Sequence, residues 1–148
     1  MYEGLKHAHS GIRWIFLALL IYAVVNAFIK WRNGAAYTEG DRKAGLFTFI
    51  FSHIQLLLGL ALYFLNDGGK VSFDNPMANA VTRFFTVEHL SMMLIGIILI
   101  SIGYSKAKRA LDGTQKFKTT FIFFGIGLLL ILSRIPWPFM SKYGGSWF

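Results

Sequence analysis

Four histidines are the residues of this sequence best suited to bind a metal or a metal-containing cofactor, because a neutral imidazole nitrogen is a common metal ligand. They are His7, His9, His53 and His89, and the chain contains no cysteine that could supply a thiolate. His7 and His9 lie in the stretch "HAHSGIRW", directly before a long apolar segment, and His89 follows Glu88 near the start of another. The sequence therefore predicts a site built from imidazoles near the ends of apolar elements.

The elements that carry these histidines are long and apolar. Of the 148 residues, 55% are hydrophobic and 15% are charged, whereas an ordinary soluble domain has about 25% charged residues. Four segments approach or exceed the roughly 20 apolar residues needed to cross a bilayer: 12–29, 44–66, 84–105 and 119–133. We therefore predict an all-α, integral membrane, up-and-down four-helix bundle. It forms a single domain over residues 1–148, with helices at about 5–32, 42–66, 77–109 and 117–135.

Lysine and arginine are concentrated in two of the predicted connections. The first and third connections hold nine of the 15 basic residues: Lys30, Arg32, Arg42, Lys43, Lys106, Lys108, Arg109, Lys116 and Lys118. Because positively charged loops remain on the cytoplasmic side, both termini and the second connection are expected outside. The net charge of +8 follows from this asymmetry. It suits contact with membrane lipid and gives no reason to expect a nucleic-acid partner.

The predicted orientation places the histidines at different depths. His9, at the outer end of the first helix, shares a leaflet with His89, near the outer end of the third, whereas His53 lies near the middle of the second helix. In an up-and-down bundle the first and third helices are diagonal. Neighbouring axes about 8–10 Å apart leave room on that diagonal for an imidazole, an iron and a second imidazole. We therefore predict a haem b with His9 and His89 as axial ligands, His7 in a supporting role and His53 as the alternative to His9.

The carboxylates of a haem need cationic partners, and the outer ends of three helices provide candidates. Arg13 follows His9 by four residues and shares its helical face, and Arg83 and Arg134 lie at the outer ends of the third and fourth spans. Guanidinium groups suit carboxylates, although snorkelling arginines that anchor helix ends are the alternative. Gly96 lies below His89 at a helical spacing and would let a flat macrocycle approach the backbone.

Four stretches carry a resemblance to known proteins: "HAHSGIRW", "SHIQLLLGLALYF", "VEHLSMMLIGIILISIGYSKAK" and "RIPWPF". Together they resemble, across nearly the whole chain, the small four-helix membrane proteins of Bacteroidota that are labelled cytochrome b. More distantly, "IQLLLGLAL" and "EHL" are similar to half of haem A synthase, whose bundles hold haem between histidines on alternate helices. The resemblance implies a bacterial inner-membrane location and supports His9 and His89 as ligands. The single four-helix unit and the lack of a cysteine pair depart from haem A synthase.

The predicted function is electron transfer rather than stand-alone catalysis. Two histidine ligands would keep the iron six-coordinate, as in a membrane b-type cytochrome that exchanges electrons with a quinol or a membrane redox protein. A homo-oligomer and a subunit of a larger complex are both open. One alternative is a membrane protein that handles copper or zinc through His7 and His9, with Met92 and Met93 deeper. Another is a haem-free accessory subunit of a respiratory complex.

Overall fold

Helices make up all the regular structure that the computed structural model describes, which covers residues 1–145 and 147. In chain order the elements are α1 (Tyr2–Asn33), α2 (Glu39–Leu65), α3 (Ala80–Arg83), the π-helix η1 (Phe84–Glu88), α4 (His89–Arg109), α5 (Gly113–Ser133) and the 3₁₀ helix η2 (Ser141–Tyr143). α3, η1 and α4 follow one another without a break and together form the third long helix. The described residues contain no strand, so the predicted all-α class is confirmed.

Capping and turn residues determine where the helices begin and end. α1 ends before Gly34, whose φ of 63° lies in the left-handed region that glycine adopts at helix ends. α2 begins with a capping box, in which the Thr38 hydroxyl accepts the Asp41 N–H and the Asp41 carboxylate accepts the Thr38 N–H. α5 begins where the Asp112 carboxylate accepts the Gln115 N–H at 2.8 Å. This cap starts α5 at residue 113, earlier than the predicted residue 117.

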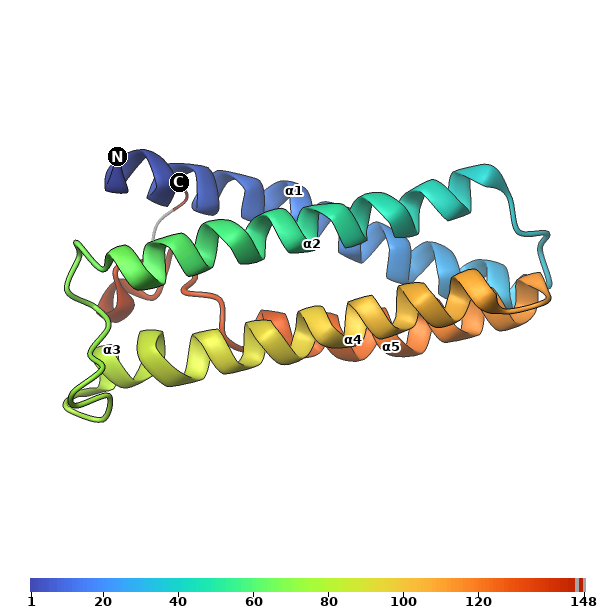
Figure 1. The fold of residues 1–148 in the computed structure, drawn as a ribbon. Coiled ribbons are helices and arrows are strands. Elements are labelled where there is room, and N and C mark those ends of the chain that lie inside the picture. Colours follow the sequence, from blue (N-terminus) through green and yellow to red (C-terminus); the bar gives the residue numbers. More distant parts are fainter. Residues whose placement is uncertain (146, 148) are drawn as a thin grey trace.

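The four long helices form an up-and-down bundle (Figure 1). α1 packs against α2 and α5, and α4 packs against α5 and α2, so α1 and α4 lie on a diagonal. The buried core is formed by side chains from α1, α4, α5 and the residues after α5: Phe16, Leu17, Leu20, Ala23, Ile100, Phe124, Ile131 and Ile135. The predicted diagonal relation between the first and third long helices is therefore present in the structure.

The outer surface of the bundle is apolar. All four long helices have the length and the composition needed to cross a membrane, and large hydrophobic side chains such as Leu57, Phe64 and Leu129 are more than two-thirds exposed. Exposure on this scale is costly in water but not against lipid tails. The chain is therefore built as a multi-pass membrane protein.

The two ends of the bundle differ in their connections. At one end the helices are joined by two short loops, close to which lie the nine basic residues identified above. At the other end lie the N-terminus, the longer segment 66–79 and the chain after α5 (Figure 1). The chain after α5 is joined to α1 at this end, since the Trp14 indole N–H donates to the Trp147 carbonyl at 2.7 Å. We call this end the terminal end.

Candidate functional site

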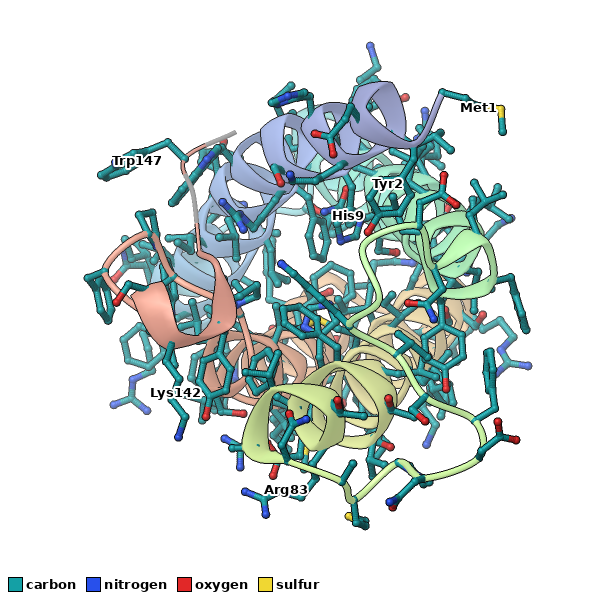
Figure 2. The ribbon with its side chains drawn as sticks, turned by 90° about the vertical axis from the view of Figure 1, so that its left-hand side faces the viewer. Met1, Tyr2, His9, Arg83, Lys142 and Trp147 are labelled. Carbon is teal, nitrogen blue, oxygen red and sulfur yellow. The ribbon has the colours of Figure 1, made fainter. Side chains whose placement is uncertain are left out.

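A cavity of about 180 Å³ lies between the helices at the terminal end. Its wall along α1 extends from Tyr2 to Leu17, a length of about 22 Å at the rise of an α-helix. Residues of α2, α4 and α5 form the other walls, and Lys70 and Gly144 contribute from the non-helical segments. In the view along the bundle, α1, α2, α4 and the C-terminal segment surround this region (Figure 2).

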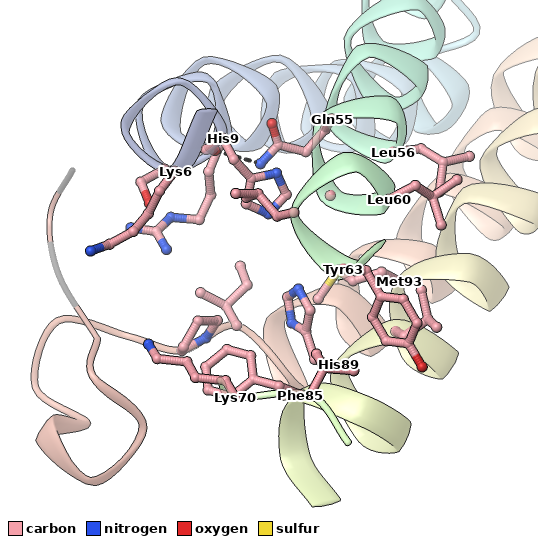
Figure 3. A pocket seen from close by; sticks show the side chains of 18 of the residues that line it. Lys6, His9, Gln55, Leu56, Leu60, Tyr63, Lys70, Phe85, His89 and Met93 are labelled. Atoms are coloured by element: carbon pink, nitrogen blue, oxygen red, sulfur yellow. Dashed lines mark hydrogen bonds between the residues drawn. The ribbon is translucent and has the colours of Figure 1, made fainter. Parts of the chain in front are cut away.

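His9 and His89 face each other across the cavity (Figure 3). Their ring centroids are 6.4 Å apart and their planes lie at 80°. Two imidazoles that bind one metal ion from opposite sides, with metal–nitrogen bonds of about 2 Å, have centroids a little more than about 6 Å apart. The predicted pair is therefore brought together, on the predicted diagonal, at a separation that suits a shared metal centre.

A backbone carbonyl fixes the orientation of the His89 ring. The Nδ1–H of His89 donates to the Arg134 carbonyl at 2.7 Å. Because a carbonyl oxygen can only accept, the proton resides on Nδ1 and the lone pair of Nε2 remains for a metal. The ring also stacks on Phe84, with centroids 5.9 Å apart. This arrangement of donor and carbonyl is typical of metal-binding histidines.

His89 owes its position to the π-helix before it. η1 ends at Glu88 and His89 is the first residue of α4. A π-helical turn holds more residues than an α-helical turn, so it rotates the residues before it relative to those after it, and such turns are frequent at functional sites. The sequence does not predict this turn, because apolar periodicity over five residues does not distinguish the two helix types.

The His9 ring is accommodated by two residues one turn apart on α2. The Gln55 side-chain amide donates to the His9 carbonyl at 2.7 Å. A Cβ atom placed on Gly59 would lie 3.2 Å from His9 Cε1, so this glycine gives the imidazole its room. Within the described part of the chain, His9 Nδ1 and Gln55 Oε1 are buried without a hydrogen-bond partner. A partnerless buried polar atom is costly and is expected where a ligand completes a site.

Three cationic side chains line the cavity: Lys6, Arg13 and Lys70. Arg13 was predicted from its spacing to His9, and it is 8% exposed. Lys6 was missed, although it precedes His9 by three residues and Arg13 by seven, which places all three on one helical face. Lys70 comes from the segment between α2 and α3, where no periodic pattern could have indicated its direction.

The other two predicted arginines do not reach the cavity. Arg83 Nε donates to the Glu88 carboxylate at 3.2 Å, and its side chain lies at the periphery of the bundle (Figure 2). Arg134 Nε lies 3.8 Å from the same carboxylate. Both guanidinium groups thus lie near Glu88, at the end of η1, and neither arginine is among the described residues that line the cavity. The predicted propionate contacts of Arg83 and Arg134 are therefore not supported, and Arg134 contributes through its carbonyl instead.

His53 lies outside the cavity and its ring is already engaged. Its Nδ1–H donates to the Phe49 carbonyl at 2.8 Å, and its Nε2 lies 3.4 Å from the Ser101 hydroxyl. The Ser101 hydroxyl also donates to the Ile97 carbonyl at 2.8 Å. The structure therefore does not support His53 as the alternative to His9.

His7 points away from the cavity. Its side chain is 61% exposed, and its Nε2 lies 4.0 Å from a Glu3 carboxylate oxygen. His7 and His9 are two residues apart on α1, so they occupy different faces and do not form a chelating pair. No group of three or more His, Cys, Asp or Glu side chains among residues 1–145 and 147 is arranged to hold a metal ion. His7 is not among the described residues that line the cavity.

Gly96 serves helix packing rather than the cavity. It is buried against α5, where an added Cβ would lie 2.8 Å from Ile131 Cγ1 and 3.3 Å from the Gly127 carbonyl oxygen. Gly96 is not among the described residues that line the cavity. The structure therefore does not support its predicted contact with a macrocycle. Small residues at such positions let membrane helices approach closely, and here they bring α4 against α5.

Comparison with known proteins does not extend these observations, since no family model, curated protein or solved structure matches the chain. The function of the site therefore rests on its own chemistry. That chemistry comprises two facing imidazoles, apolar walls and three cations.

Proposed function

We propose that the chain is a membrane b-type cytochrome in which His9 and His89 hold one haem b as its two axial ligands. The observation that carries the proposal is the separation of 6.4 Å between the two ring centroids across a cavity between diagonal helices. When bound, a six-coordinate haem supplies one-electron transfer. The chain would act as an electron carrier or redox subunit, with a quinol or a membrane redox protein as its partner.

The residues around the imidazoles suit this role. The Arg134 carbonyl orients the His89 ring and keeps its Nε2 unprotonated, and Gln55 holds the His9 backbone at the cavity wall. The deeper wall is apolar and excludes water, with Leu56, Leu60, Met93, Ile97 and Ile131 among its residues. Ligand orientation, burial and nearby charge are the means by which a protein sets a haem potential.

The charge distribution supports one orientation in the bacterial inner membrane. The nine basic residues of the two short loops lie at the end opposite the imidazole pair. The positive-inside tendency then places that end in the cytoplasm and the terminal end outside. The imidazole pair would lie in the outer leaflet, accessible to partners at the outer face.

The absorption spectrum of protein purified from membranes tests the proposal. We expect a reducible low-spin haem band in the reduced-minus-oxidised spectrum of the full chain. His9→Ala and His89→Ala should each abolish it, through haem loss or conversion to high spin, because each removes one axial ligand. His7→Ala and His53→Ala are matched controls and should retain it, since neither ring lines the cavity.

Two outcomes would contradict the assignment. Purified protein without a haem band under conditions that load other b-type cytochromes would favour a haem-free accessory subunit. A His53→Ala variant that loses the low-spin band while His9→Ala retains it would replace His9 by His53 as the partner of His89.

A further inference from the structure

We propose that Lys6, Arg13 and Lys70 form a carboxylate-binding side of the cavity, so that its ligand is an amphiphilic dianion with an apolar body and two acid groups along one edge. The inference deepens the proposed function and rests on it, because it assigns that edge to the haem propionates. It retains Arg13 from the arginines that the sequence offers as carboxylate partners and adds Lys6 and Lys70 in place of Arg83 and Arg134.

The first argument is the sign of the charge around the cavity. Lys6, Arg13 and Lys70 line it, whereas no aspartate or glutamate is among the described residues that do. The positive charges of Lys6 and Lys70 repel each other, and the repulsion is stronger there than in water because the effective dielectric constant is lower. A dianionic ligand offsets this charge, and it would gain charge-assisted hydrogen bonds from the same groups.

Lys6 is positioned by the helix that also carries His9. Residues 6, 9 and 13 share one face of α1, so the ammonium projects toward the same space as the imidazole. Lys6 Nζ contacts a Glu3 carboxylate oxygen at 3.2 Å. Glu3 is 67% exposed, and an exposed pair of this kind contributes little free energy. A carboxylate inside the cavity can therefore compete for Lys6.

Lys70 is held by the segment that follows α2. Asn66 fixes this segment through two hydrogen bonds with the Val71 backbone, at 2.7 Å and 3.0 Å. Lys70 Nζ lies over the Phe85 ring at 4.8 Å from the centroid and donates to the Tyr143 carbonyl at 3.4 Å. These contacts orient the ammonium, and neither of them is with a carboxylate.

The environment of Lys70 disfavours its charged form. Burial lowers the pKa of the Lys70 ammonium, and the positive charge of Lys6 lowers it further, while Glu3 raises it. The ammonium groups of Lys6 and Lys70, which belong to different segments, are therefore close enough to repel each other. A carboxylate between them would reverse the effect by stabilising both charged forms.

The polarity of the cavity gives the ligand a direction. In Figure 3 the ammonium groups of Lys6 and Lys70 lie on one side of the facing imidazoles, and Leu56, Leu60 and Met93 lie on the other. A flat ligand held between the rings would thus meet charge along one edge and hydrocarbon along the opposite edge. Haem b has this distribution, because its two propionates occupy one edge of an otherwise apolar macrocycle.

The experiment compares haem b with its dimethyl ester, which has the same macrocycle without the two negative charges. Full-length haem-depleted protein in phosphatidylcholine nanodiscs is titrated with each compound, and binding is followed by the Soret absorption. We expect haem b to bind at least about tenfold more tightly than the ester, the equivalent of one charge-assisted hydrogen bond. The variant K6Q/K70Q should weaken haem b about tenfold or more and leave the ester unchanged, and R13Q should act in the same direction.

Two variants serve as controls. Lys142→Gln removes a cation at the terminal end that lies at the periphery (Figure 2) and does not line the cavity, so it should preserve the preference for haem b. K6R/K70R retains both charges and should preserve it as well. Unchanged ester binding shows that K6Q/K70Q is folded, so a loss confined to haem b reports on charge.

The outcomes separate this inference from the proposed function. Tight binding of both compounds with the same ratio in the wild type and in K6Q/K70Q would overturn the carboxylate-binding side and leave the cytochrome proposal standing. An equal loss of both compounds in K6Q/K70Q would also overturn it, because the lysines would then act on packing. Binding of neither compound to the wild type would overturn both. A preference that vanishes when phosphatidylglycerol is added would assign the lysines to lipid phosphate instead.

Discussion

The imidazole planes of His9 and His89 are nearly perpendicular, at 80°, while their centroids are 6.4 Å apart. The two rings have different surroundings. The Arg134 carbonyl accepts the Nδ1–H of His89, and Gly59 lies against the edge of His9. The angle is therefore a property of the surrounding helices and not of the two rings alone.

Under the proposed function, the angle predicts the electron paramagnetic resonance spectrum of the oxidised, haem-loaded protein. Perpendicular imidazoles donate into different iron d orbitals, which leaves two of those orbitals nearly equal in energy. We expect the strongly anisotropic low-spin signal with a large maximum g value, rather than the rhombic signal of parallel rings. A rhombic spectrum in fully loaded wild type would contradict the geometry. Gly59→Ala should change the signal, since its Cβ would meet the His9 ring at 3.2 Å.

Asp41 is expected to stabilise the end of the bundle opposite the imidazoles. Its carboxylate accepts from Asn26 and Lys30, each at 2.8 Å, and from the Thr38 N–H that it caps. Asp41→Ala leaves a half-buried ammonium without its partner and removes a helix cap, which should cost about 2–4 kcal/mol. Denaturant unfolding in detergent micelles measures the loss.

Glu39 provides the matched control for Asp41. It lies two residues earlier in the same turn, and its exposed carboxylate pairs only with the neighbouring Arg42 among the contacts of the described residues. Glu39→Ala should therefore change stability by less than about 1 kcal/mol. Equal effects of the two substitutions would show that Asp41 does not join α1 to α2.

Gly96 is predicted to set the distance between α4 and α5. Gly96→Ala places a Cβ 2.8 Å from Ile131 Cγ1 and 3.3 Å from the Gly127 carbonyl, so the helices must separate, at a cost of about 1–3 kcal/mol. Gly125→Ala is the control, because its Cβ would meet only Val24 Cγ1, at 4.0 Å, and alanine favours a helix by up to about 1 kcal/mol. Thermal unfolding should move in opposite directions for the two variants; shifts of the same sign would refute the packing role.

The orientation can be tested by single cysteines, because the chain has none of its own. One variant, Asp74→Cys, places the cysteine in the segment between α2 and α3. The other, Leu111→Cys, places it in the loop between α4 and α5, where the Leu111 side chain is fully exposed. With the terminal end outside, an impermeant maleimide should label the first in intact cells and the second only after lysis. The reverse pattern would invert the topology.

Hydropathy and spacing predicted the fold and the central pair of the site. The four apolar segments required four helices, and an up-and-down order placed His9 and His89 on a diagonal. Spacing on α1 also predicted Arg13. These features are local, or follow from the order of the helices, so the sequence alone is sufficient for them.

The rest of the site depends on contacts that sequence spacing does not determine. Lys70 reaches the cavity through a non-helical segment fixed by Asn66. Arg83 and Arg134 were expected there because of their depth, but Arg83 donates to Glu88 at the end of η1, and Arg134 Nε lies 3.8 Å from the same carboxylate. A π-helical turn rotates the residues before it relative to those after it by an amount that an α-helical period cannot predict, so the direction of Arg83 could not be read from its spacing. Arg134 follows the last turn of α5, where helical spacing no longer fixes the direction of a side chain.

The position of the imidazole pair near one end of the bundle has an electrical consequence. From His89 to Arg109 the third long helix continues for 20 residues, about 30 Å, through a core in which Leu20, Ile100 and Phe124 are fully packed. His53, the remaining imidazole at that depth, bonds to protein groups. Under the proposed function, electrons would enter and leave through the same face. Turnover would then move no charge through the bilayer, and would neither build up nor draw on the transmembrane voltage.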